Sequence, residues 1–235
     1  MNIVITGASK GLGKAIAEAF AKDENGHAFF LCSRNAADLE AAGKDLKEGF
    51  PQHKIYTKTC DVSDKTSLKQ FVEWVNSHAA YIDILVNNAG IYLPGSAYGE
   101  DDAVLEKMME VNLYSAYHLT RMILPGMIVK KSGHVFNICS IASIMAYPNG
   151  GAYSISKFAL YGFSKNLREE MKQHGIKVTH VLPGAAYTDS WSGSGIDPKR
   201  IMEAADVAQM VYAAAQLSAQ ACVEEIVLRP QLGDL

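Results

Sequence analysis

The chain has 235 residues, of which 49% are hydrophobic and 20% charged, and its formal net charge is −3 at pH 7. A chain of this length can bury a core without disulfide or metal support, and its composition excludes a disordered or collagen-like protein. It lacks the basic excess that nucleic-acid binding normally requires, so we expect no nucleic-acid partner.

Short β-branched runs alternate with longer amphipathic segments along the whole chain. Runs of strand length lie at about 2–6, 28–32, 54–59, 82–86, 133–139, 176–182 and 224–229. Segments with helical spacing lie at about 11–23, 36–48, 64–78, 101–129, 152–173 and 203–217. This alternation predicts an α/β fold, a Rossmann-type three-layer αβα sandwich with a seven-stranded parallel sheet, as one domain over residues 1–235. Ligands bind beyond the carboxyl ends of such strands, so we expect functional residues to follow the strands.

A glycine-rich turn, Thr6 to Gly13, links the first strand to the first helix. Glycine permits a positive φ angle and a close approach of the backbone to a ligand. The start of the helix offers N–H groups and a positive dipole end to a pyrophosphate. The position favours a dinucleotide site over a purely structural turn, although the spacing is not the common GxGxxG. The expected contacts are Gly7, Ser9, Lys10, Gly11, Leu12 and Gly13.

The second strand ends in Ser33-Arg34-Asn35, without a carboxylate. An acidic residue here would bind the ribose hydroxyls and select NAD, whereas an arginine pairs with the 2′-phosphate of NADP. Arg34 can bind a phosphate through two hydrogen bonds, Ser33 can donate another, and Lys10 can add charge. A solvated surface arginine is the alternative. We predict NADP(H) as the cofactor.

The helix predicted at about 152–173 contains two pairs in which a lysine follows a tyrosine by four residues. They are Tyr153/Lys157 and Tyr161/Lys165. This helix starts at the ligand end of the sheet, so Tyr161 lies ~12 Å farther along it than Tyr153. We therefore predict Tyr153 as the reacting phenol and Tyr161 as a packing residue of the core or of a subunit interface.

A phenol beside a lysine suits carbonyl reduction, because hydride transfer leaves an alkoxide that must receive a proton. A phenol with a pKa near 10 serves poorly unless its anion is stabilised. A cation ~4 Å away, at an effective dielectric constant of 20, supplies roughly 4 kcal/mol of that stabilisation. The Tyr153/Lys157 pair can therefore exchange a proton near neutral pH.

Further short motifs follow the predicted strands in a fixed order. They are Thr6-Gly7-x3-Gly11-x-Gly13, Asp61-Val62, Asn87-Asn88-Ala89-Gly90, Asn112, Ser140, Tyr153-x3-Lys157 and Pro183-Gly184-x3-Thr188. In this order and spacing the chain resembles the short-chain dehydrogenase/reductase family, of the single-domain type, from residue 2 to the last strand.

The resemblance implies a catalytic role for four residues. Tyr153 would be the proton donor and acceptor, and Ser140 would hydrogen-bond the substrate oxygen. Lys157 would also bind the nicotinamide ribose, and Asn112 would hold a water that links Lys157 to solvent. Alternatively, Asn112 bonds a neighbouring backbone and Ser140 caps a turn. The further cofactor contacts implied are Asp61 and Val62 at the adenine, Asn88, Ala89 and Gly90 along the adenosine, and Pro183, Gly184 and Thr188 at the carboxamide.

A finer resemblance concerns the substrate. The tail from Val223 to Asp234, and Gly184 to Thr188 with Trp191 shortly after, resemble bacterial sepiapterin-reductase-like members. A pterin side-chain ketone is then a candidate substrate. Tyr92, Tyr147 and Trp191 fall near the expected pocket mouth, where they can stack on a flat ring. We favour the alternative that they fold over any apolar substrate. The Gly- and Ser-rich segment at about 184–200 is long for a connection and is predicted to be the substrate lid.

The prediction is an NADPH-dependent oxidoreductase that reduces a ketone or aldehyde by hydride transfer, with Tyr153 as general acid. One alternative is a 3-oxoacyl-carrier-protein reductase, which needs a basic docking patch for which Lys130 and Lys131 are the scattered candidates. Another is a non-enzymatic NADP(H)-sensing regulator, which would typically have lost Tyr153 or Lys157.

The remaining features concern location, metals and assembly. The four cysteines (Cys32, Cys60, Cys139, Cys222) lie far apart, so we expect buried thiols in a reducing cytoplasm. The seven histidines lack the spacing of a metal site, so we expect no metal. We see neither a signal peptide nor a transmembrane run, so we expect no membrane partner. Apolar positions on the helices at about 101–129 and 152–173 predict a homodimer or homotetramer, since members of the family usually assemble through these helices.

Overall fold

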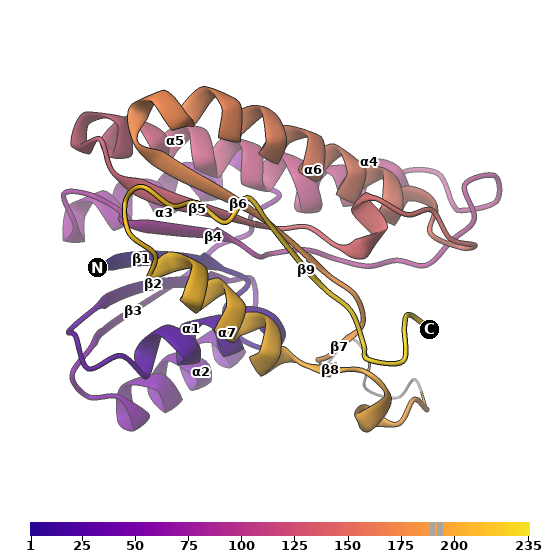
Figure 1. Ribbon diagram of the computed structural model, residues 1–235, viewed down its shortest axis with the longest axis horizontal. Coiled ribbons are helices and arrows are strands. Elements are labelled where there is room, and N and C mark those ends of the chain that lie inside the picture. Colours follow the sequence, from indigo (N-terminus) through magenta and orange to yellow (C-terminus); the bar gives the residue numbers. More distant parts are fainter. Residues whose placement is uncertain (189–190, 192–194) are drawn as a thin grey trace.

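The computed structural model describes residues 1–188, 191 and 195–235. At its centre is a seven-stranded sheet in the order β3–β2–β1–β4–β5–β6–β9, in which every neighbouring pair is parallel (Figure 1). The strands are β1 (Asn2–Thr6), β2 (Ala28–Ser33), β3 (Lys54–Thr59), β4 (Ile84–Asn87), β5 (Gly133–Ile138), β6 (Ile176–Pro183) and β9 (Glu225–Leu228). The predicted Rossmann-type α/β fold is confirmed.

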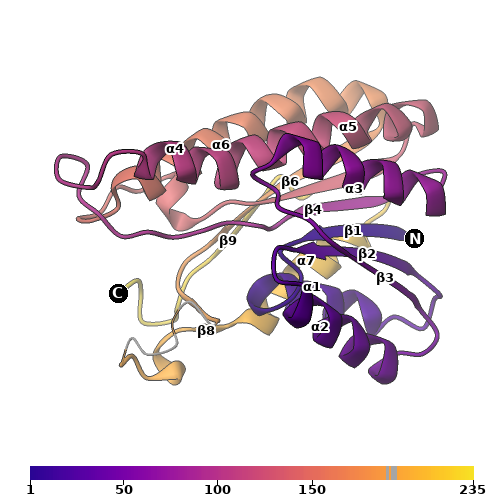
Figure 2. The ribbon, with the colours of Figure 1, turned by 180° about the vertical axis from the view of Figure 1, so that it is seen from behind.

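Helices cover both faces of this sheet, as the views from the front and from behind show (Figures 1 and 2). One face carries α1 (Gly11–Ala21), α2 (Ala36–Gly49) and α7 (Ala204–Ala215). The other carries α3 (Lys65–His78), α4 (Val104–Met109), α5 (Ser115–Lys130) and α6 (Gly151–Met171). None of the helices in the described part of the chain has the length and apolar character needed to cross a bilayer.

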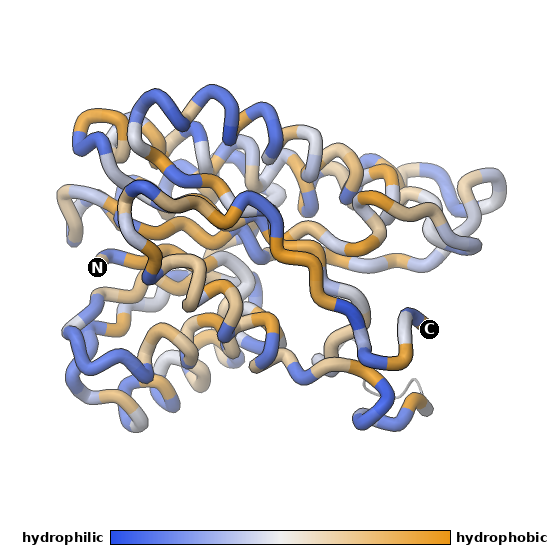
Figure 3. The backbone as a smooth tube through the Cα atoms, viewed as in Figure 1, coloured by the Kyte–Doolittle hydropathy of each residue, from blue (hydrophilic) through white to orange (hydrophobic). Residues whose placement is uncertain are grey.

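The core is divided into two main layers by the sheet. Phe29 of β2 packs in the same cluster as Phe20 of α1. Phe30, the residue after Phe29, packs with Phe71 of α3 on the opposite face. Successive strand residues point to opposite faces, and both faces are covered, so the inner strands are mostly apolar rather than strictly alternating. Figure 3 shows this as hydrophobic colour along the central strands.

The structure divides the helix expected at about 101–129 into three parts. A π-helical turn, Glu110–Tyr114, lies between α4 and α5 and contains Asn112. Such turns are rare and occur frequently at functional sites. The apolar spacing of the sequence does not distinguish this turn from a regular helix.

The predicted lid at about 184–200 contains one short strand, β7 (Ala186–Tyr187), which pairs in parallel with β8 (Met202–Glu203) just beyond the lid. Residues 189–190 and 192–194 of the lid lie outside the described part. Among the cysteines, Cys32, Cys60 and Cys139 are buried free thiols as expected, but Cys222 is only partly buried.

His134 is a titratable group held inside the core. Its ring stacks on Phe136 of the same strand with a centroid distance of 3.9 Å, and its Nε2 lies 2.7 Å from Oγ1 of Thr179. The Thr179 hydroxyl donates to the carbonyl oxygen of Val223 at 2.6 Å, so Nε2 of His134 is the donor to Thr179. Burial, with a smaller contribution from the positive charge of Lys177, lowers the pKa of His134 to about 3.

We expect the burial of His134 to make stability depend on pH. Well above pH 6.5 His134 is neutral in both the folded and the unfolded state. Below pH 6.5 the unfolded chain binds a proton at this residue, whereas the folded protein binds it only near pH 3. His134 should therefore contribute a fall of about 1.4 kcal/mol per pH unit to the free energy of unfolding as the pH drops through this window.

The measurement is urea unfolding between pH 7 and pH 5. His134→Gln keeps a donor for Thr179 and should reduce the slope of stability against pH, whereas His174→Gln, in the turn after α6, should not. A slope that His134→Gln leaves unchanged would contradict the assignment.

Candidate active site

The glycine turn after β1 has a backbone that other residues would not tolerate. Gly7 and Gly11 have φ angles of +64° and +54°, in the left-handed region that favours glycine. A Cβ atom at Gly13 would overlap the carbonyl oxygen of Gly7 and lie 2.5 Å from Nδ2 of Asn88. The turn therefore packs directly on the end of β4.

Hydrogen bonds hold the residues after β4 against this turn. Asn88 Nδ2 donates to the carbonyl oxygens of Thr6 and Gly7, at 2.9 and 3.2 Å. Thr6 Oγ1 in turn accepts from the backbone N–H groups of Asn88 and Ala89, at 3.1 and 3.0 Å. The predicted residues Asn88, Ala89 and Gly90 thus share one edge of the sheet with the glycine turn.

The first turn of α1 fits a pyrophosphate group. It has no acidic residue, and Lys10 occupies the N-cap position, where a side-chain oxygen is usual. The positive end of the helix and this lysine both favour an anion. Gly11 also lies close to the loop after β6, because a Cβ atom at Gly11 would lie 3.3 Å from Cβ of Thr188.

The ends of β2 and β3 meet where the adenosine is expected. The side chain of Arg34 is exposed, while Ser33 is buried and its hydroxyl donates to the carbonyl oxygen of Asn35 at 3.1 Å. Burial by itself raises the pKa of Asp61, but hydrogen bonds from Ser63 and the charge of Arg34 bring the pKa below its ordinary value. Arg34 and Asp61 therefore lie within electrostatic reach of each other.

Tyr153 and Lys157 lie at the start of α6. Tyr153 is the third residue of the helix and partly exposed, whereas Lys157 is only 5% exposed. The ammonium of Lys157 donates to the carbonyl oxygen of Ile138, at the end of β5, at 2.9 Å. Its Nζ lies 5.8 Å from the centre of the Tyr153 ring. One charged hydrogen bond thus joins the helix to the carboxyl end of the sheet.

Asn112 is buried, and its side chain is bonded on both sides. Its Oδ1 accepts from the N–H of Ile91 at 2.8 Å, and its Nδ2 donates to the carbonyl oxygen of Ile91 at 3.0 Å. Nδ2 also lies 2.9 Å from Oγ of Ser156, whose hydroxyl donates to the carbonyl oxygen of Tyr153. The structure therefore contains the alternative arrangement, in which Asn112 bonds a neighbouring backbone.

Ser140 follows β5 and begins the 3₁₀ turn Ile141–Ser143. Its Oγ accepts from the N–H of Ala142 at 3.1 Å, so it caps this turn as the alternative anticipated. A hydroxyl that accepts one hydrogen bond can still donate its own hydrogen. The cap fixes the oxygen and is compatible with donation to a ligand.

The four predicted catalytic residues converge around the ends of β4 and β5. A Cβ atom at Gly90 would lie 3.3 Å from Oδ1 of Asn112 and 3.6 Å from Nζ of Lys157. Ile138, which binds that Nζ, precedes Ser140 by two residues. A phenol, a cation and a hydroxyl are thereby placed beside the loop after β4, which packs on the glycine turn.

Two of the three aromatic residues predicted for the pocket mouth lie by Tyr153. The ring of Tyr92 meets that of Tyr153 edge to face, with centroids 4.9 Å apart. Burial, and then the neighbouring hydroxyls of Tyr92 and Tyr153, raise the pKa of Tyr147 above its ordinary value. Trp191 lies beyond β7, where its backbone N–H donates to the carbonyl oxygen of Thr188 at 2.9 Å.

The second Tyr–Lys pair has a different environment, toward the β9 edge of the sheet. The hydroxyl of Tyr161 donates to the carboxylate of Glu225, and its ring packs edge-on against His180, with centroids 5.4 Å apart. The distinction between the two pairs agrees with the expected geometry, since Tyr161 packs on β6 and β9.

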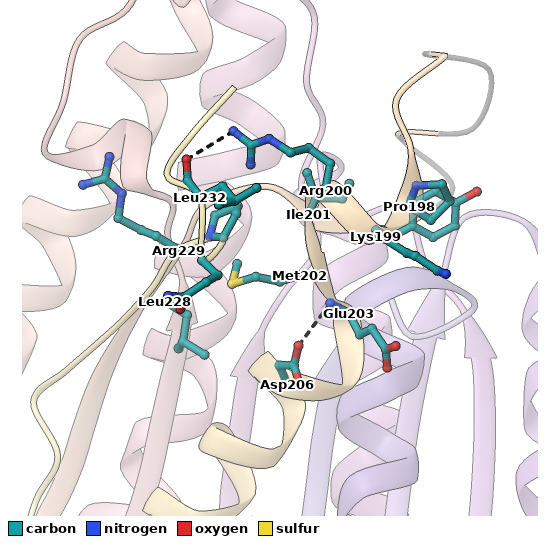
Figure 4. Close-up of a pocket in the computed structure, with 13 residues that line it drawn as sticks. Pro198, Lys199, Arg200, Ile201, Met202, Glu203, Asp206, Leu228, Arg229 and Leu232 are labelled. Carbon is teal, nitrogen blue, oxygen red and sulfur yellow. Dashed lines mark hydrogen bonds between the residues drawn. The ribbon is translucent and has the colours of Figure 1, made fainter.

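A groove of about 880 Å³ lies between β8 and the tail that follows β9 (Figure 4). Arg200 crosses it to donate to the carbonyl oxygens of Leu232, Gly233 and Asp234. The described residues that line this groove include Tyr187 of the lid but none of the four predicted catalytic residues.

Sequence reasoning missed Glu100, in the loop after β4. Both carboxylate oxygens accept from the N–H of Ala152, at 3.1 and 3.2 Å, immediately before Tyr153. The two residues are far apart in the chain, so no local pattern indicates the contact. Within the described residues, no three His, Cys, Asp or Glu side chains are grouped as a metal site requires.

Comparison with known proteins finds relatives over nearly the whole chain. A sepiapterin reductase from Chlorobaculum tepidum is 33% identical over 240 residues, covering 99% of this chain and 97% of that protein. A metagenomic short-chain oxidoreductase, solved in complex with NADP, is 30% identical with a TM-score of 0.84, covering 98% of this chain and 97% of that one. An alcohol dehydrogenase from the archaeon Thermococcus sibiricus, complexed with 5-hydroxy-NADP, is 27% identical with a TM-score of 0.89, covering 98% and 96%.

The family resemblance expected from the motifs is confirmed. The model of the short chain dehydrogenase family matches residues 1–198, which include the glycine turn, Asn112, Ser140, Tyr153 and Lys157. This chain is therefore an oxidoreductase of the short chain dehydrogenase family.

Proposed function

We propose that this oxidoreductase reduces a ketone or aldehyde with NADPH. The observation that supports it most is the convergence of Tyr153, Lys157, Ser140 and Asn112 at the ends of β4 and β5, beside the glycine turn. A phenol, a buried cation and an oriented hydroxyl are what the protonation of a reduced carbonyl oxygen requires.

The cofactor proposal rests on this chain's residues and on its relatives. The glycine turn and the first turn of α1 suit a pyrophosphate, and the exposed guanidinium of Arg34 suits a 2′-phosphate. Both solved relatives described above were crystallised with NADP or a derivative of it. When bound, the reduced nicotinamide supplies the hydride that the carbonyl carbon accepts.

The chain's own residues handle the substrate oxygen and its proton. The hydroxyl of Ser140, held by the N–H of Ala142, donates to the substrate oxygen and orients the carbonyl. The phenol of Tyr153 gives its proton to that oxygen as the carbon is reduced. The ammonium of Lys157, held by Ile138, stabilises the phenolate that remains and binds the nicotinamide ribose.

Asn112 supports the loop and the helix that carry these residues. Its bonds to Ile91 and Ser156 fix the loop after β4 against the first turn of α6. We further propose that Asn112 holds a water that links Lys157 to solvent, and that Tyr153 is reprotonated by this route.

The substrate is proposed to be a carbonyl compound with a flat or apolar body. Tyr92 and Tyr147, 48% and 40% exposed, offer aromatic surface beside Tyr153, and we propose residues 184–200, with Trp191, as the lid. A pterin side-chain ketone is a specific candidate, supported by the similarity to the Chlorobaculum tepidum sepiapterin reductase.

We also propose that the chain, as one domain, forms a homodimer or homotetramer in the cytoplasm. The support is exposed apolar surface on the two long helices, at Tyr114 and Tyr117 near the start of α5 and at Ile155 and Phe158 on α6.

Tyr153→Phe should abolish most of the activity without loss of cofactor binding. The variant lacks the proton donor, so kcat should fall by about 10²- to 10⁴-fold. Activity is measured as NADPH oxidation on the best substrate among sepiapterin, diketones and short 3-oxoacyl thioesters, and binding by NADPH fluorescence.

The second Tyr–Lys pair provides the control. Tyr161→Phe removes a hydroxyl at the same helical spacing and should change kcat less than about twofold, since Tyr161 bonds Glu225 instead. Near-normal turnover in Tyr153→Phe would refute the proposed mechanism.

Arg34→Asp should shift the cofactor preference toward NADH. It removes a charge-assisted contact to the 2′-phosphate and adds a repulsive carboxylate, so the ratio of kcat/KM for NADPH to that for NADH should fall about 10- to 100-fold. Lys47→Asp, in the last turn of α2, makes the same change of charge far from the carboxyl ends of the strands and should leave the ratio unaltered. An unchanged ratio in Arg34→Asp would exclude a role in binding the phosphate.

A further inference from the structure

The N-terminus of α6, the helix that carries Tyr153, is not capped by the side chain of its own N-cap residue. Gly150 occupies the N-cap position and has no side chain to accept from the first N–H groups of α6. The N–H of Ala152, the second residue of the helix, instead meets both oxygens of Glu100, at 3.1 and 3.2 Å. A residue from the loop after β4 thus supplies the cap.

A negatively charged group suits this position. The N-terminus of a helix carries a positive partial charge, and a carboxylate forms a stronger hydrogen bond than a neutral acceptor does. The contact is partly shielded from solvent, because Glu100 is partly buried and Ala152 is fully buried. The bond therefore stabilises the first turn of α6 where Tyr153 begins.

The backbones of the two segments are fitted closely around this carboxylate. A Cβ atom at Gly151 would overlap the carbonyl oxygen of Gly95 and lie 2.6 Å from Oε2 of Glu100. Gly95 also donates its N–H to the carbonyl oxygen of Asn149 at 3.2 Å. Only a residue without a side chain can occupy position 151 without displacing the loop.

A tight turn aims Glu100 at the helix. The N–H groups of Gly99 and Glu100 both donate to the carbonyl oxygen of Ser96, each at 3.0 Å. At the other end of the same loop, Tyr92 packs edge to face on Tyr153. The loop from Ile91 to Ala103 therefore contacts the first turn of α6 at two separate points.

We propose that Glu100 is a positioning residue for Tyr153, which it holds by capping α6 and by tying to it the loop that carries Tyr92. This inference rests on the proposed function, in which Tyr153 protonates the substrate oxygen. In this proposal Glu100 acts through the first turn of α6 and not on the substrate or cofactor. Glu100 affects the positions of the Tyr153 phenol and of the Tyr92 ring beside it. These positions matter because a displacement of about 1 Å at a reacting group can lower the rate up to about 100-fold.

The test compares two substitutions of the same residue. Glu100→Ala removes the cap and should lower kcat about tenfold or more, with KM for NADPH changed less than about twofold, because the glycine turn is untouched. Glu100→Gln retains an oxygen that accepts from Ala152, so kcat should return to within about threefold of the parent. Asp102→Ala removes an exposed carboxylate from the same loop and serves as the matched control.

A second variant tests the contact from the helix side. Gly151→Ala forces a Cβ atom into Gly95 and Glu100, so it should lower kcat as Glu100→Ala does. The double variant should be no slower than the slower single variant, because both changes break one contact. Multiplied effects in the double variant would overturn the proposal.

Hydrogen exchange separates this inference from the proposed function. In the protein without substrate, the N–H of Ala152 should exchange about tenfold faster or more in Glu100→Ala, but not in Asp102→Ala. If the parent reduces no carbonyl compound, the proposed function fails, and unchanged exchange would show that the cap fails as well.

If the parent is active and Glu100→Ala keeps kcat within about twofold, the positioning role is refuted while the proposed function stands. A kcat in Glu100→Gln as low as in Glu100→Ala also overturns the proposal, because the hydrogen bond alone would then not account for the effect.

Discussion

The ammonium of Lys157 is the charge on which the arrangement of the site depends. A buried cation is costly unless its hydrogens are bonded, and Lys157 donates to the carbonyl oxygen of Ile138 at the last residue of β5. That bond fixes the register of α6 on the sheet, and Tyr153 lies one helical turn before it. The space around the ammonium is equally constrained, since Gly90 has no side chain where a Cβ atom would approach both Lys157 and Asn112.

The backbone is irregular at two places along the edge of the sheet where this site lies. The π-helical turn Glu110–Tyr114 places Asn112 against the loop after β4, and left-handed glycines form the turn after β1. Both departures from regular structure lie at the carboxyl edge of the sheet, whereas the strands and helices behind them are regular. The apolar layers on both faces supply the stability that lets this edge deviate.

The sequence predicts the scaffold well because the sheet is covered on both faces. Buried parallel strands are short apolar runs, and Asn2–Thr6 has the expected bounds. The partly exposed edge strand Lys54–Thr59 also has the expected bounds. The rule that function follows the strand ends also identifies the neighbourhood of Ser140, Tyr153 and Lys157. These predictions depend on local pattern and on topology, both of which are properties of sequence order.

What escaped prediction depends on contacts between distant segments. The π-helical turn keeps the apolar spacing of a regular helix. The strands β7 and β8 have two residues each and form a parallel pair with each other, so they are too short for a sequence pattern to reveal. The partners of Asn112 and the contact of Glu100 with Ala152 are long-range hydrogen bonds, which no local composition indicates.

A double-mutant cycle on Tyr153 and Lys157 tests the central claim most directly. Lys157→Met replaces the ammonium with a neutral chain of similar length, and kcat is compared in the parent and in the Tyr153→Phe background at saturating NADPH. If the ammonium acts through the phenol, Lys157→Met lowers kcat strongly in the parent and hardly at all once the phenol is gone. An equal fall in both backgrounds would mean that the two side chains act independently, and would contradict the account.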